Sequence, residues 1–573
     1  MRRAFAALLA LAVGCVGELG AYETKTGGRD GSDPRPGPGG YALTVDTTGT
    51  DSYAPAHATS WTVSGRVVAS EGLDSLTVAG GAAPVAGDGR FSRDVSLEPG
   101  LTLVPIEAAD LGAPPHVRQA HRSILAASYL PEGHINSRAA AIVLTNEVVA
   151  PIAEPLQARV AGIDIAREIM ARRTLTDDDC RTVADAASHG TPMLSLTVEG
   201  GALWLQITIP NLDIRYHGTC SAVIFSTDIS GRMRTSVVLR TQLSAPTGDV
   251  CASGLDHTPA VVDLVGFDND VSGGGSLLEM LLVSLMAEMR EGDTADAMKA
   301  EFEAQADVLL GSELSGLSAF DSMETMTLFD TPIDVRLCLT GLASEGGTLR
   351  ATIGATATGS GGGDVAVMAP GAPMVTGELP ASAPGKLWLD SGLVGQLLFA
   401  AWRGGALASE SVSEIDVGTL SVVVPDLRGR YPAGTMAQIG IDGRMPPLVR
   451  AAVPADGDLL LDIGELHLLI SAGGELLFWI GAQIRMTLEL VPEAGALRPE
   501  VVDVSADTWI IEEPVVDADE EVLNAAVQLQ IADAASALLG DATIALPEIG
   551  GALTPTDVTA TPGARYVEIT LAP

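Results

Sequence analysis

The chain has 573 residues, of which 73 are acidic and 33 basic, so its formal net charge is −40. That length allows three or four domains. So strong a negative charge argues against nucleic acid as a partner and against attraction to anionic lipid surfaces. Mean hydropathy is +0.29, yet beyond the N-terminus no run of about 18 apolar residues occurs. The apolar side chains are therefore expected inside large cores or along an apolar cavity.

The first 15 residues have the pattern of an export signal. Arg2 and Arg3 form a basic start, and residues 4–13 are apolar but too short for a stop-transfer helix. Residues 12–15 (AVGC) resemble a bacterial lipobox, in which Cys15 is the lipidated residue. We therefore expect a lipoprotein signal peptide and an exported, membrane-anchored protein that faces the periplasm or the cell surface. An ordinary signal peptide with an incidental cysteine is the alternative, and it also implies export.

The next two segments differ in composition. Residues 16–60 are rich in Gly, Pro, Asp and Thr without an apolar period, which predicts a flexible tether. Residues 61–130 hold short alternating runs, such as Trp61–Val68 and Phe91–Leu97, with turn signals about every ten residues. This pattern predicts a small β-sandwich, and its 86–103 stretch resembles the Ig-like modules of exported bacterial proteins.

From residue 134 onward the pattern changes to long strands and long helices. Alternation predicts antiparallel strands over 194–198, 203–209, 222–226, 235–243, 333–339 and 348–353. An apolar stripe at steps of three and four predicts a long helix over Ser276–Leu310. These elements form a first unit at 134–357, followed by a connector rich in Gly, Ala and Pro at 358–383.

The remainder, 384–573, repeats this order of elements. Helices are expected at 387–402 and Glu520–Leu539, with strands at 419–424, 436–441, 459–463 and 478–491. We therefore expect an α+β fold, in which two tandem curved antiparallel sheets each wrap around long amphipathic helices. The small all-β Ig-like sandwich precedes them as a spacer.

Two stretches carry a family resemblance. Residues 391–407 (SGLVGQLLFAAWRGGAL) are similar to the helix that opens the second barrel of the tubular lipid-binding (TULIP) superfamily. Residues 546–553 (LPEIGGAL), with the terminal strand, are similar to its closing segment. That superfamily includes bactericidal/permeability-increasing protein, lipopolysaccharide-binding protein and cholesteryl ester transfer protein. The resemblance implies two barrels, 134–357 and 384–573, that hold acyl chains in apolar pockets between helix and sheet. The acidic composition departs from the bactericidal members, which hold lipopolysaccharide phosphates on basic surface.

The candidate lipid-binding side chains lie on the predicted helices. They are Leu278, Leu281, Leu282, Leu285, Met289, Leu393, Leu397, Leu398, Leu523, Val527 and Ile531. Ordinary core packing is the alternative for each of them, because a cavity cannot be read from a sequence. A phospholipid or a fatty acid is the expected ligand, and no cofactor is expected.

Four cysteines follow Cys15, namely Cys180, Cys220, Cys251 and Cys338. An even number in an exported chain predicts two disulfides, with three possible pairings. No CxxC pair occurs, and no cluster has the spacing of zinc ligands.

One stretch has the spacing of a calcium loop. Asp268, Asp270, Ser272 and Glu279 fall at ligand positions of an EF-hand, and Gly273 falls at the sixth position. The residues before Asp268 do not have a helical pattern, so the alternative is a turn that caps the following helix. We predict no metal site here.

Motifs of enzymes are missing from the sequence. There is no Gly-x-Ser-x-Gly, His-Glu-x-x-His, phosphate-binding loop or Rossmann fingerprint. His116 and His121 are expected on the surface, because no carboxylate lies at a ligand-like offset. We therefore expect a non-enzymatic lipid-binding or lipid-transfer lipoprotein of the bacterial envelope. The alternative is a cell-surface scaffold or adhesion protein whose barrels are filled by side chains.

Overall fold

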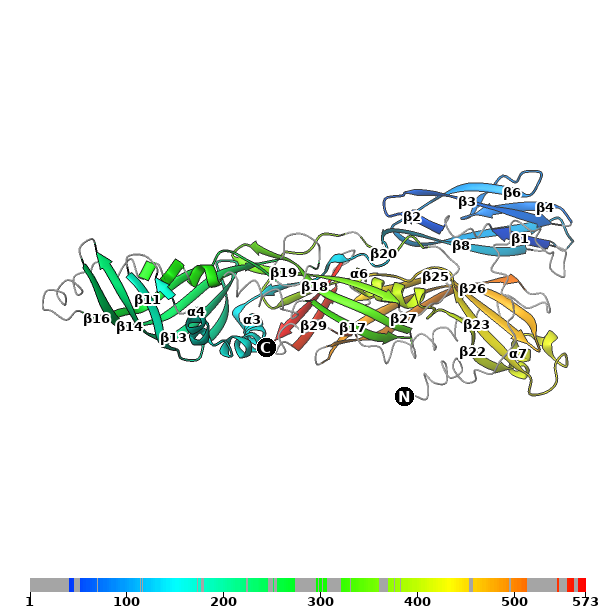
Figure 1. The fold of residues 1–573 in the computed structure, drawn as a ribbon. Helices are drawn as coiled ribbons and strands as arrows, with labels where there is room; N and C mark the ends of the chain where they lie inside the picture. The colour runs from blue at the N-terminus through cyan, green and yellow to red at the C-terminus, as the bar shows by residue number, and fades with distance from the viewer. Residues whose placement is uncertain are drawn as a thin grey trace.

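The structure is a computed structural model of the chain. It describes residues 41–45, 52–69, 71–113, 115, 117–172, 174–176, 180–222, 225–245, 251, 255–273, 295–296, 298–300, 302–306, 321–329, 331–359, 369–375, 377–381, 383–452, 457–493, 496–512, 544–545, 554–560 and 565–572. Figure 1 shows an elongated body in which three sheets follow one another, with a small β-sandwich along one end.

The sandwich has two sheets over a core of its own. One sheet has the order β1 (Tyr41–Val45), β3 (Ser60–Ala69), β6 (Arg90–Ser96). The other has the order β2 (Tyr53–Pro55), β8 (Val117–Leu130), β7 (Gly100–Asp110), β4 (Leu73–Val78), β5 (Gly81–Ala82). Alternate apolar side chains of both sheets meet in this core, where Ile106 and Ile124 are fully buried.

The sheet farthest from the sandwich is called the distal sheet here. Its order is β10 (Thr174–Thr176), β11 (Cys180–Ser188), β13 (Ala202–Ala222), β14 (Phe225–Ser244), β15 (Asp256–His257). Two further strands pair with it, β12 (Met193–Glu199) with β13 and β16 (Val261–Gly273) with β14. All of its strand pairs are antiparallel.

A central sheet joins parts of the chain that are far apart in sequence. Its order is β17 (Asp321–Leu328), β18 (Thr331–Glu345), β19 (Thr348–Gly359), β9 (Asn136–Leu144), β21 (Lys386–Asp390), β30 (Tyr566–Ala572), β29 (Thr554–Ala560). Because β9 lies between β19 and β21, and β30 lies beside β21, the two predicted units share one sheet and are not separate bodies.

The proximal sheet lies under the sandwich. Its order is β22 (Ala408–Asp416), β23 (Met436–Gly443), β25 (Leu459–Ala472), β26 (Glu475–Glu493), β27 (Ala496–Glu512), β28 (Ile544–Ala545), and β24 (Leu448–Ala451) pairs with β25. The strand β20 (Ala372–Met374), within the predicted connector, pairs with β8 of the sandwich and packs against helix α6.

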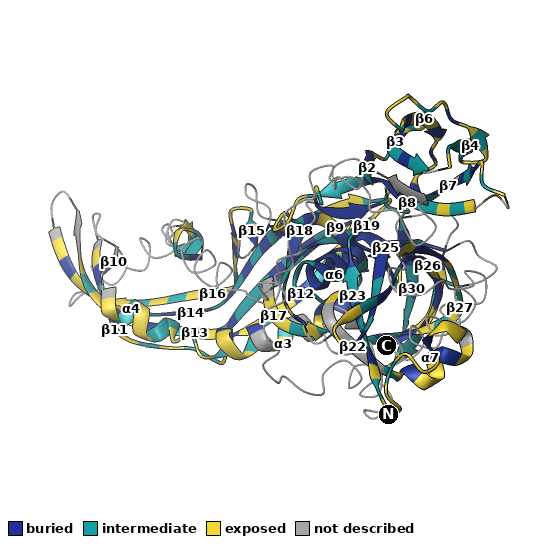
Figure 2. Ribbon diagram, turned by 90° about the vertical axis from the view of Figure 1, so that its right-hand side faces the viewer, coloured by how far each residue is buried: buried dark blue, intermediate teal, exposed yellow. Residues whose placement is uncertain are grey.

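The described helices are short. They are α3 (Asn146–Ala161), α4 (Ile165–Arg172), α6 (Ser391–Arg403), α7 (Val417–Val423) and the 3-10 helix η3 (Pro425–Leu427), together with helical residues 295–296, 298–300 and 302–306. Helix α6 begins where the Asp390 side chain accepts a hydrogen bond from Gly392 N. Figure 2 shows α6 buried among the surrounding strands. No helix in the described part of the chain has the length and apolar character needed to cross a membrane.

The prediction of an α+β fold, with two curved sheets wrapped around long amphipathic helices, is wrong. Most described residues lie in strands, and the longest helix among them, α3, has 16 residues. One hydrophobic core instead runs through the distal, central and proximal sheets, from Ala139 to Ile569. An apolar strand face needs only an apolar surface opposite it, and another strand face meets that need as well as a helix does.

Two predicted helices and one predicted strand need separate comment. Glu520–Leu539 lies outside the described residues, and so do residues 276–294 and 307–310 of the predicted helix Ser276–Leu310, whereas the described residues among 295–306 are helical. The strand predicted at 419–424 is wrong, because helix α7 covers 417–423. Its N-terminus is capped by Asp416, which accepts from Gly418 N at 3.1 Å.

Candidate functional site

The distal sheet is built around one long hairpin of β13 and β14. Side chains that alternate along both strands are buried on one face, where the largest group is apolar: Leu203, Leu205, Ile209, Leu212, Ile214, Met233, Val237, Leu239 and Leu243. The buried polar side chains of β14 on this face are Thr227, Thr235 and Thr241, and the hydroxyls of Thr235 and Thr241 donate to Val265 O and Thr258 O at 3.3 and 2.6 Å. This face is therefore a mainly apolar surface.

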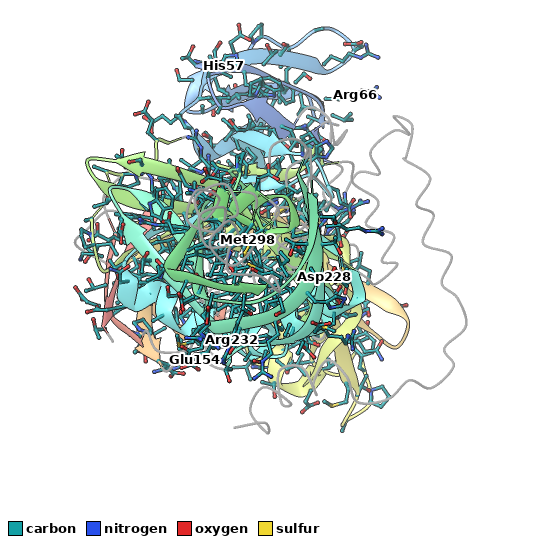
Figure 3. All side chains as sticks on the ribbon, turned by 60° about the vertical axis from the view of Figure 1, so that its left-hand side comes forward. His57, Arg66, Glu154, Asp228, Arg232 and Met298 are labelled. Carbon is teal, nitrogen blue, oxygen red and sulfur yellow. A yellow bond between two sulfur atoms is a disulfide. The ribbon has the colours of Figure 1, made fainter. Side chains whose placement is uncertain are left out.

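Register shifts at neighbouring positions of two strand pairs bend the distal sheet. The pairing of β13 with β14 shifts between Ile209 and Leu212, where Asn211 has a φ of 52°. The pairing of β14 with β16 shifts between Arg234 and Ser236, which lie beside that point. A β-bulge bends its strand and increases the local twist, so neighbouring bulges curl the sheet about one line. The buried face is the concave one (Figure 3).

The opposite, outer face carries charges in pairs. Asp213 accepts from Arg232 Nε at 2.9 and 3.0 Å, and Arg234 Nη1 lies 3.5 Å from Asp268 Oδ2. The hydrogen bond from Arg232 holds the pKa of Asp213 below its usual value. The guanidinium of Arg240 lies 4.3 Å from the ring centroid of Trp204. Polar outer and apolar concave residues alternate, as expected for a sheet with one wetted face.

Helices α3 and α4 border the concave face on the side of β11 and β12. The side chain of Gln157 on α3 donates to Pro192 O at 3.0 Å, and Asn146 Oδ1 accepts from Val198 N at 2.7 Å. Val149 and Leu156 of α3 are buried in the shared core. These amide bonds occupy backbone groups of the edge strand β12 and so fix the helix to it.

Helical residues 298–300 and 302–306 border the concave face on the side of β16. Met298 and Phe302 pack against the shared core, and Ala306 is buried in it. Glu303 Oε1 accepts from Val262 N of β16 at 3.4 Å, which ties the helix to this strand. Figure 3 shows Met298 within the arc of the sheet.

Near the outer end of the concave face, an aromatic residue carries a polar group. The Tyr216 ring lies over Gly231, where an added Cβ would meet ring atoms at 2.4 Å. Its hydroxyl donates to Asn269 Oδ1 at 2.8 Å. Burial, reinforced by the charge of Asp270, raises the pKa of Tyr216 despite that hydrogen bond. The tyrosine is therefore neutral and packs as part of the surface.

The predicted lipid-binding residues are distributed differently. Leu278, Leu281, Leu282, Leu285, Met289, Leu523, Val527 and Ile531 lie outside the described residues, as does Cys15. Leu393 and Leu398 of α6 are buried in the shared core, and Leu397 packs with Ile333 and Ala401. The α6 leucines therefore pack against other side chains in the described part of the chain, and their contact with lipid stays a prediction.

The calcium-loop pattern does not form a loop. Asp268, Asp270 and Ser272 lie on the regular strand β16, opposite Arg234, Arg232 and Ser230 of β14. Glu279 lies outside the described residues. Among the residues that the structure describes, no group of three His, Cys, Asp or Glu side chains is placed to hold a metal ion.

One disulfide joins Cys251 to Cys338, across 87 residues, and fixes the segment after β14 to β18 of the central sheet. Cys180 and Cys220 are direct register partners on β11 and β13, and their side chains lie outside the described set.

Sequence reasoning missed a buried polar group between the sandwich and the proximal sheet. Glu465, His467 and Gln483 contribute to it from the proximal sheet, and Ser123 from β8. His121 also lies here, next to Trp509, and not on the surface as predicted. The one signal in the sequence is Gly464-Glu465, which interrupts the apolar run of β25.

Comparisons with known proteins give limited support for any relationship. No protein-family model matches the chain, and no curated protein matches it. The chain is similar to the crystal structure of a lipopolysaccharide binding protein, with 12% identity and a TM-score of 0.34 over 76% of this chain and 98% of that one. It is also similar to a Ca²⁺-stabilised adhesin with which an Antarctic bacterium binds ice, with 11% identity and a TM-score of 0.12 over 83% of this chain and 99% of that one. Neither TM-score is high enough to establish a common fold.

Proposed function

We propose that this protein is a non-enzymatic lipid-binding protein, which holds acyl chains against the concave face of the distal sheet. The observation that carries the proposal is the shape and chemistry of that face. Its strands curl around a surface of Leu, Ile, Val and Met side chains, while the charged side chains lie on the outer face. Each methylene of an acyl chain that is buried on such a surface contributes about 0.8 kcal/mol.

The positions of strands β11 and β16 in the distal sheet support the same proposal. β11 and β16 lie on opposite sides of the β13–β14 hairpin and do not pair with each other in the described part of the sheet. The inward side chains of β16 become less buried along the strand: Val262 is fully buried, whereas Phe267 and Val271 are only partly buried. The acyl chain of a ligand can therefore lie against the partly buried side chains of β16, because no backbone hydrogen bonds between β11 and β16 in the described sheet have to break first.

The setting that we propose for this activity is the bacterial envelope. The signal-like first 15 residues, with Cys15 as the lipidated residue, support export and anchoring to a membrane. A phospholipid or a fatty acid is the ligand class, because its tail matches an apolar concave surface and needs no basic site. The same chain would carry lipid between membranes or hold it in place.

Uptake of a fluorescent fatty acid by delipidated full-length protein tests the proposal. Val271→Trp adds bulk on the concave face of β16 and is expected to weaken uptake at least about tenfold, since more than a kcal/mol of apolar contact is replaced. Val265→Trp is the matched control, because Val265 lies on the same strand, faces outward and is 57% exposed. It is expected to leave uptake unchanged.

Native mass spectrometry of protein purified without detergent gives an independent readout. Co-purified phospholipid or fatty acid is expected for the parent and reduced for Val271→Trp. If the delipidated parent takes up no fatty acid or phospholipid and carries none on purification, the lipid proposal is wrong. A surface scaffold or adhesion protein with side-chain-filled sheets would then be the better description.

A further inference from the structure

The strand β8 is buried on both faces. Ile124 and Ala126 point into the core of the sandwich, whereas Leu125 and Ala127 belong to a second cluster that faces the rest of the chain. Such two-sided burial is typical of a strand inside a protein and not at the rim of a mobile module. The sandwich is therefore docked on the body and does not act as a free spacer (Figure 1).

Part of this docking is apolar and closely fitted. Leu101 and Leu125 of the sandwich pack with Met445 and Leu448 next to the proximal sheet. Gly464 allows this approach, because a Cβ there would lie 2.9 Å from both Leu101 Cδ1 and Met445 Sδ.

A further part of the docking, besides the pairing of β20 with β8, is a hydrogen-bonded carboxylate. Glu465 follows Gly464 at a register shift of β25 and has a φ of 49°, a left-handed conformation that is costly for a residue with a side chain. Its Oε1 accepts from Ser123 N of β8 at 2.9 Å. The hydroxyl of Ser123 donates to Gln483 Oε1 at 3.0 Å. The strained bulge thus projects a carboxylate onto the sandwich.

His467 contacts the other oxygen of this carboxylate, Oε2. Trp479 Nε1 donates to His467 Nδ1 at 3.1 Å, and an indole N–H is only a donor, so Nδ1 carries no proton. The proton of the neutral ring is then on Nε2, which lies 3.4 Å from Glu465 Oε2. Arg444 lies over the Trp479 ring at 5.5 Å. The chain Trp479–His467–Glu465–Ser123 requires an ionised glutamate and a neutral histidine.

A second histidine lies in the same interface without a hydrogen-bond partner. The His121 ring is 4.9 Å from the Trp509 ring, and its Nδ1 is buried with no partner among the described residues. The charged groups that face it are Asp507 on β27 and Glu465 on β25. A proton on Nδ1 would place a buried donor where no described residue is positioned to accept its hydrogen bond.

We propose that Glu465 and His121 form an acid-released latch, which keeps the sandwich docked on the proximal sheet near neutral pH and lets it separate in acid. Docking buries the glutamate as an acceptor and the histidine as a neutral ring. Protonation of Glu465 weakens it as an acceptor, and protonation of His121 makes the neutral ring charged. Each protonation therefore weakens docking. Separation would uncover the apolar surface of Leu101, Leu125, Met445 and Leu448.

The direction of the pH dependence agrees with this geometry. Burial lowers the pKa of His121 below its ordinary 6.5, although Asp507 and Glu465 oppose the shift. For Glu465, burial alone would raise the pKa, but the hydrogen bonds from His467 and Ser123 N and the charge of Arg122 together hold it below its ordinary 4.5. In both cases the undocked state binds protons more readily, so docking weakens as the pH falls, first below 6.5 and again below 4.5.

Hydrogen exchange of the full chain, corrected for the intrinsic pH dependence of exchange, tests the latch. Between about pH 8 and about pH 5, peptides over β8 and the middle of β25 are expected to lose protection while β13 and β14 keep theirs. Because one proton is involved, the population of the open state gains at most about tenfold for each pH unit below the ordinary 6.5 of the undocked ring.

Two variants separate the two groups. His121→Phe keeps a ring against Trp509 but cannot be protonated, and it is expected to remove the loss of protection between about pH 7 and about pH 5. Glu465→Gln keeps an oxygen for Ser123 N but cannot gain a proton, so docking is expected to be weaker at neutral pH and no longer to respond to acid below about pH 4.5. The controls are His57→Phe and Glu107→Gln, at exposed positions on the sandwich, and they are expected to behave as the parent does (Figure 3 labels His57).

Three results would overturn the latch. One is protection over β8 that does not change with pH in the parent. Another is an unchanged pH profile in His121→Phe and Glu465→Gln. The third is loss of protection in β13 and β14 together with β8, which would indicate global acid unfolding and not separation of the sandwich.

Discussion

The carboxylate of Asp390 and the guanidinium of Arg565, 175 residues apart in sequence, form a buried two-point ion pair, with Nε to Oδ1 at 2.9 Å and Nη2 to Oδ2 at 2.5 Å. The pair joins the start of α6 to the start of β30, and Asn136 of β9 donates to Asp390 Oδ2 at 2.6 Å. Three distant segments of the chain therefore share one carboxylate. Asp390 is fully buried, so the hydrogen bonds replace all of its water.

The first prediction concerns this pair. Arg565→Ala is expected to lower the free energy of unfolding by about 3–5 kcal/mol, because it leaves a buried carboxylate without its cation. Arg498→Ala is the control: Arg498 pairs with Glu493 and Glu500 on the surface, where such pairs contribute about 0–1 kcal/mol. Chemical denaturation followed by circular dichroism measures both, and equal effects of the two substitutions would contradict the role given to Arg565.

The second prediction contrasts two aspartates near β25. Asp458 is buried and accepts from Leu490 N at 2.8 Å, with no cation paired to it among the described residues, and burial raises its pKa above the ordinary 3.8. The native state then binds this proton more tightly than the unfolded chain does, so stability falls as the pH rises through the interval above 3.8. Asp458→Asn keeps an acceptor oxygen, removes the charge and is expected to preserve or raise stability at neutral pH.

Asp462 is the comparison for Asp458, because its replacement by asparagine is expected to lower stability. Its carboxylate accepts from Arg450 Nη2 at 2.9 Å and from Arg485 Nε at 2.7 Å. Asp462→Asn leaves two partly exposed guanidinium groups without a counter-charge and is expected to cost about 1–3 kcal/mol through the lost charged hydrogen bonds. Thermal unfolding of the two variants at neutral pH gives the comparison, and a larger loss in Asp458→Asn than in Asp462→Asn would refute this account of both sites.

The third prediction concerns the fit of the sandwich at Gly464. Gly464→Val places methyl groups against Leu101 and Met445 and is expected to cost about 1–3 kcal/mol through overpacking. The loss should appear as faster hydrogen exchange over β8 at neutral pH. Gly87→Val is the control, since a Cβ there meets nothing within 4 Å. An unaltered β8 in Gly464→Val would show that the interface is looser than the contact distances imply.

The fourth prediction concerns the disulfide. Replacing Cys251 and Cys338 with serine opens a loop of 87 residues and is expected to lower stability by about 2–4 kcal/mol. Denaturation midpoints with and without a reducing agent measure this, with the double variant expected to be insensitive to reduction at that bond. A reduced parent as stable as the oxidised one would show that the bond contributes nothing.

The strands themselves could be predicted from the sequence because their signal is local. Alternation in 203–209 and 478–491 depends only on which face of a strand meets water, and both segments lie within the observed strands β13 and β26. The helices were predicted less well for a related reason. Apolar spacing does not say whether a helix or another strand will cover a given face, and at 417–423 the Asp416 cap decides for a helix.

The buried polar group between the sandwich and the proximal sheet could not be predicted, since its members come from three strands that are far apart in sequence. Ser123 and His121 lie on β8, Glu465 on β25 and Gln483 on β26, and none has a partner nearby in sequence other than His467. A lone polar residue in a strand is read as solvent-facing, as His121 was. Only docking of the sandwich brings these residues together.

The acidic composition and the alternation that places strands follow from the sequence alone, because each depends only on residue type and not on contacts between distant residues. The tertiary structure alone decides that β9, β21 and β30 share one sheet, that Asp390 meets Arg565, and that the distal strands bulge at one level and curl. These features arise from contacts between residues that are tens to hundreds of positions apart. Their free energy depends on geometry that no local pattern encodes.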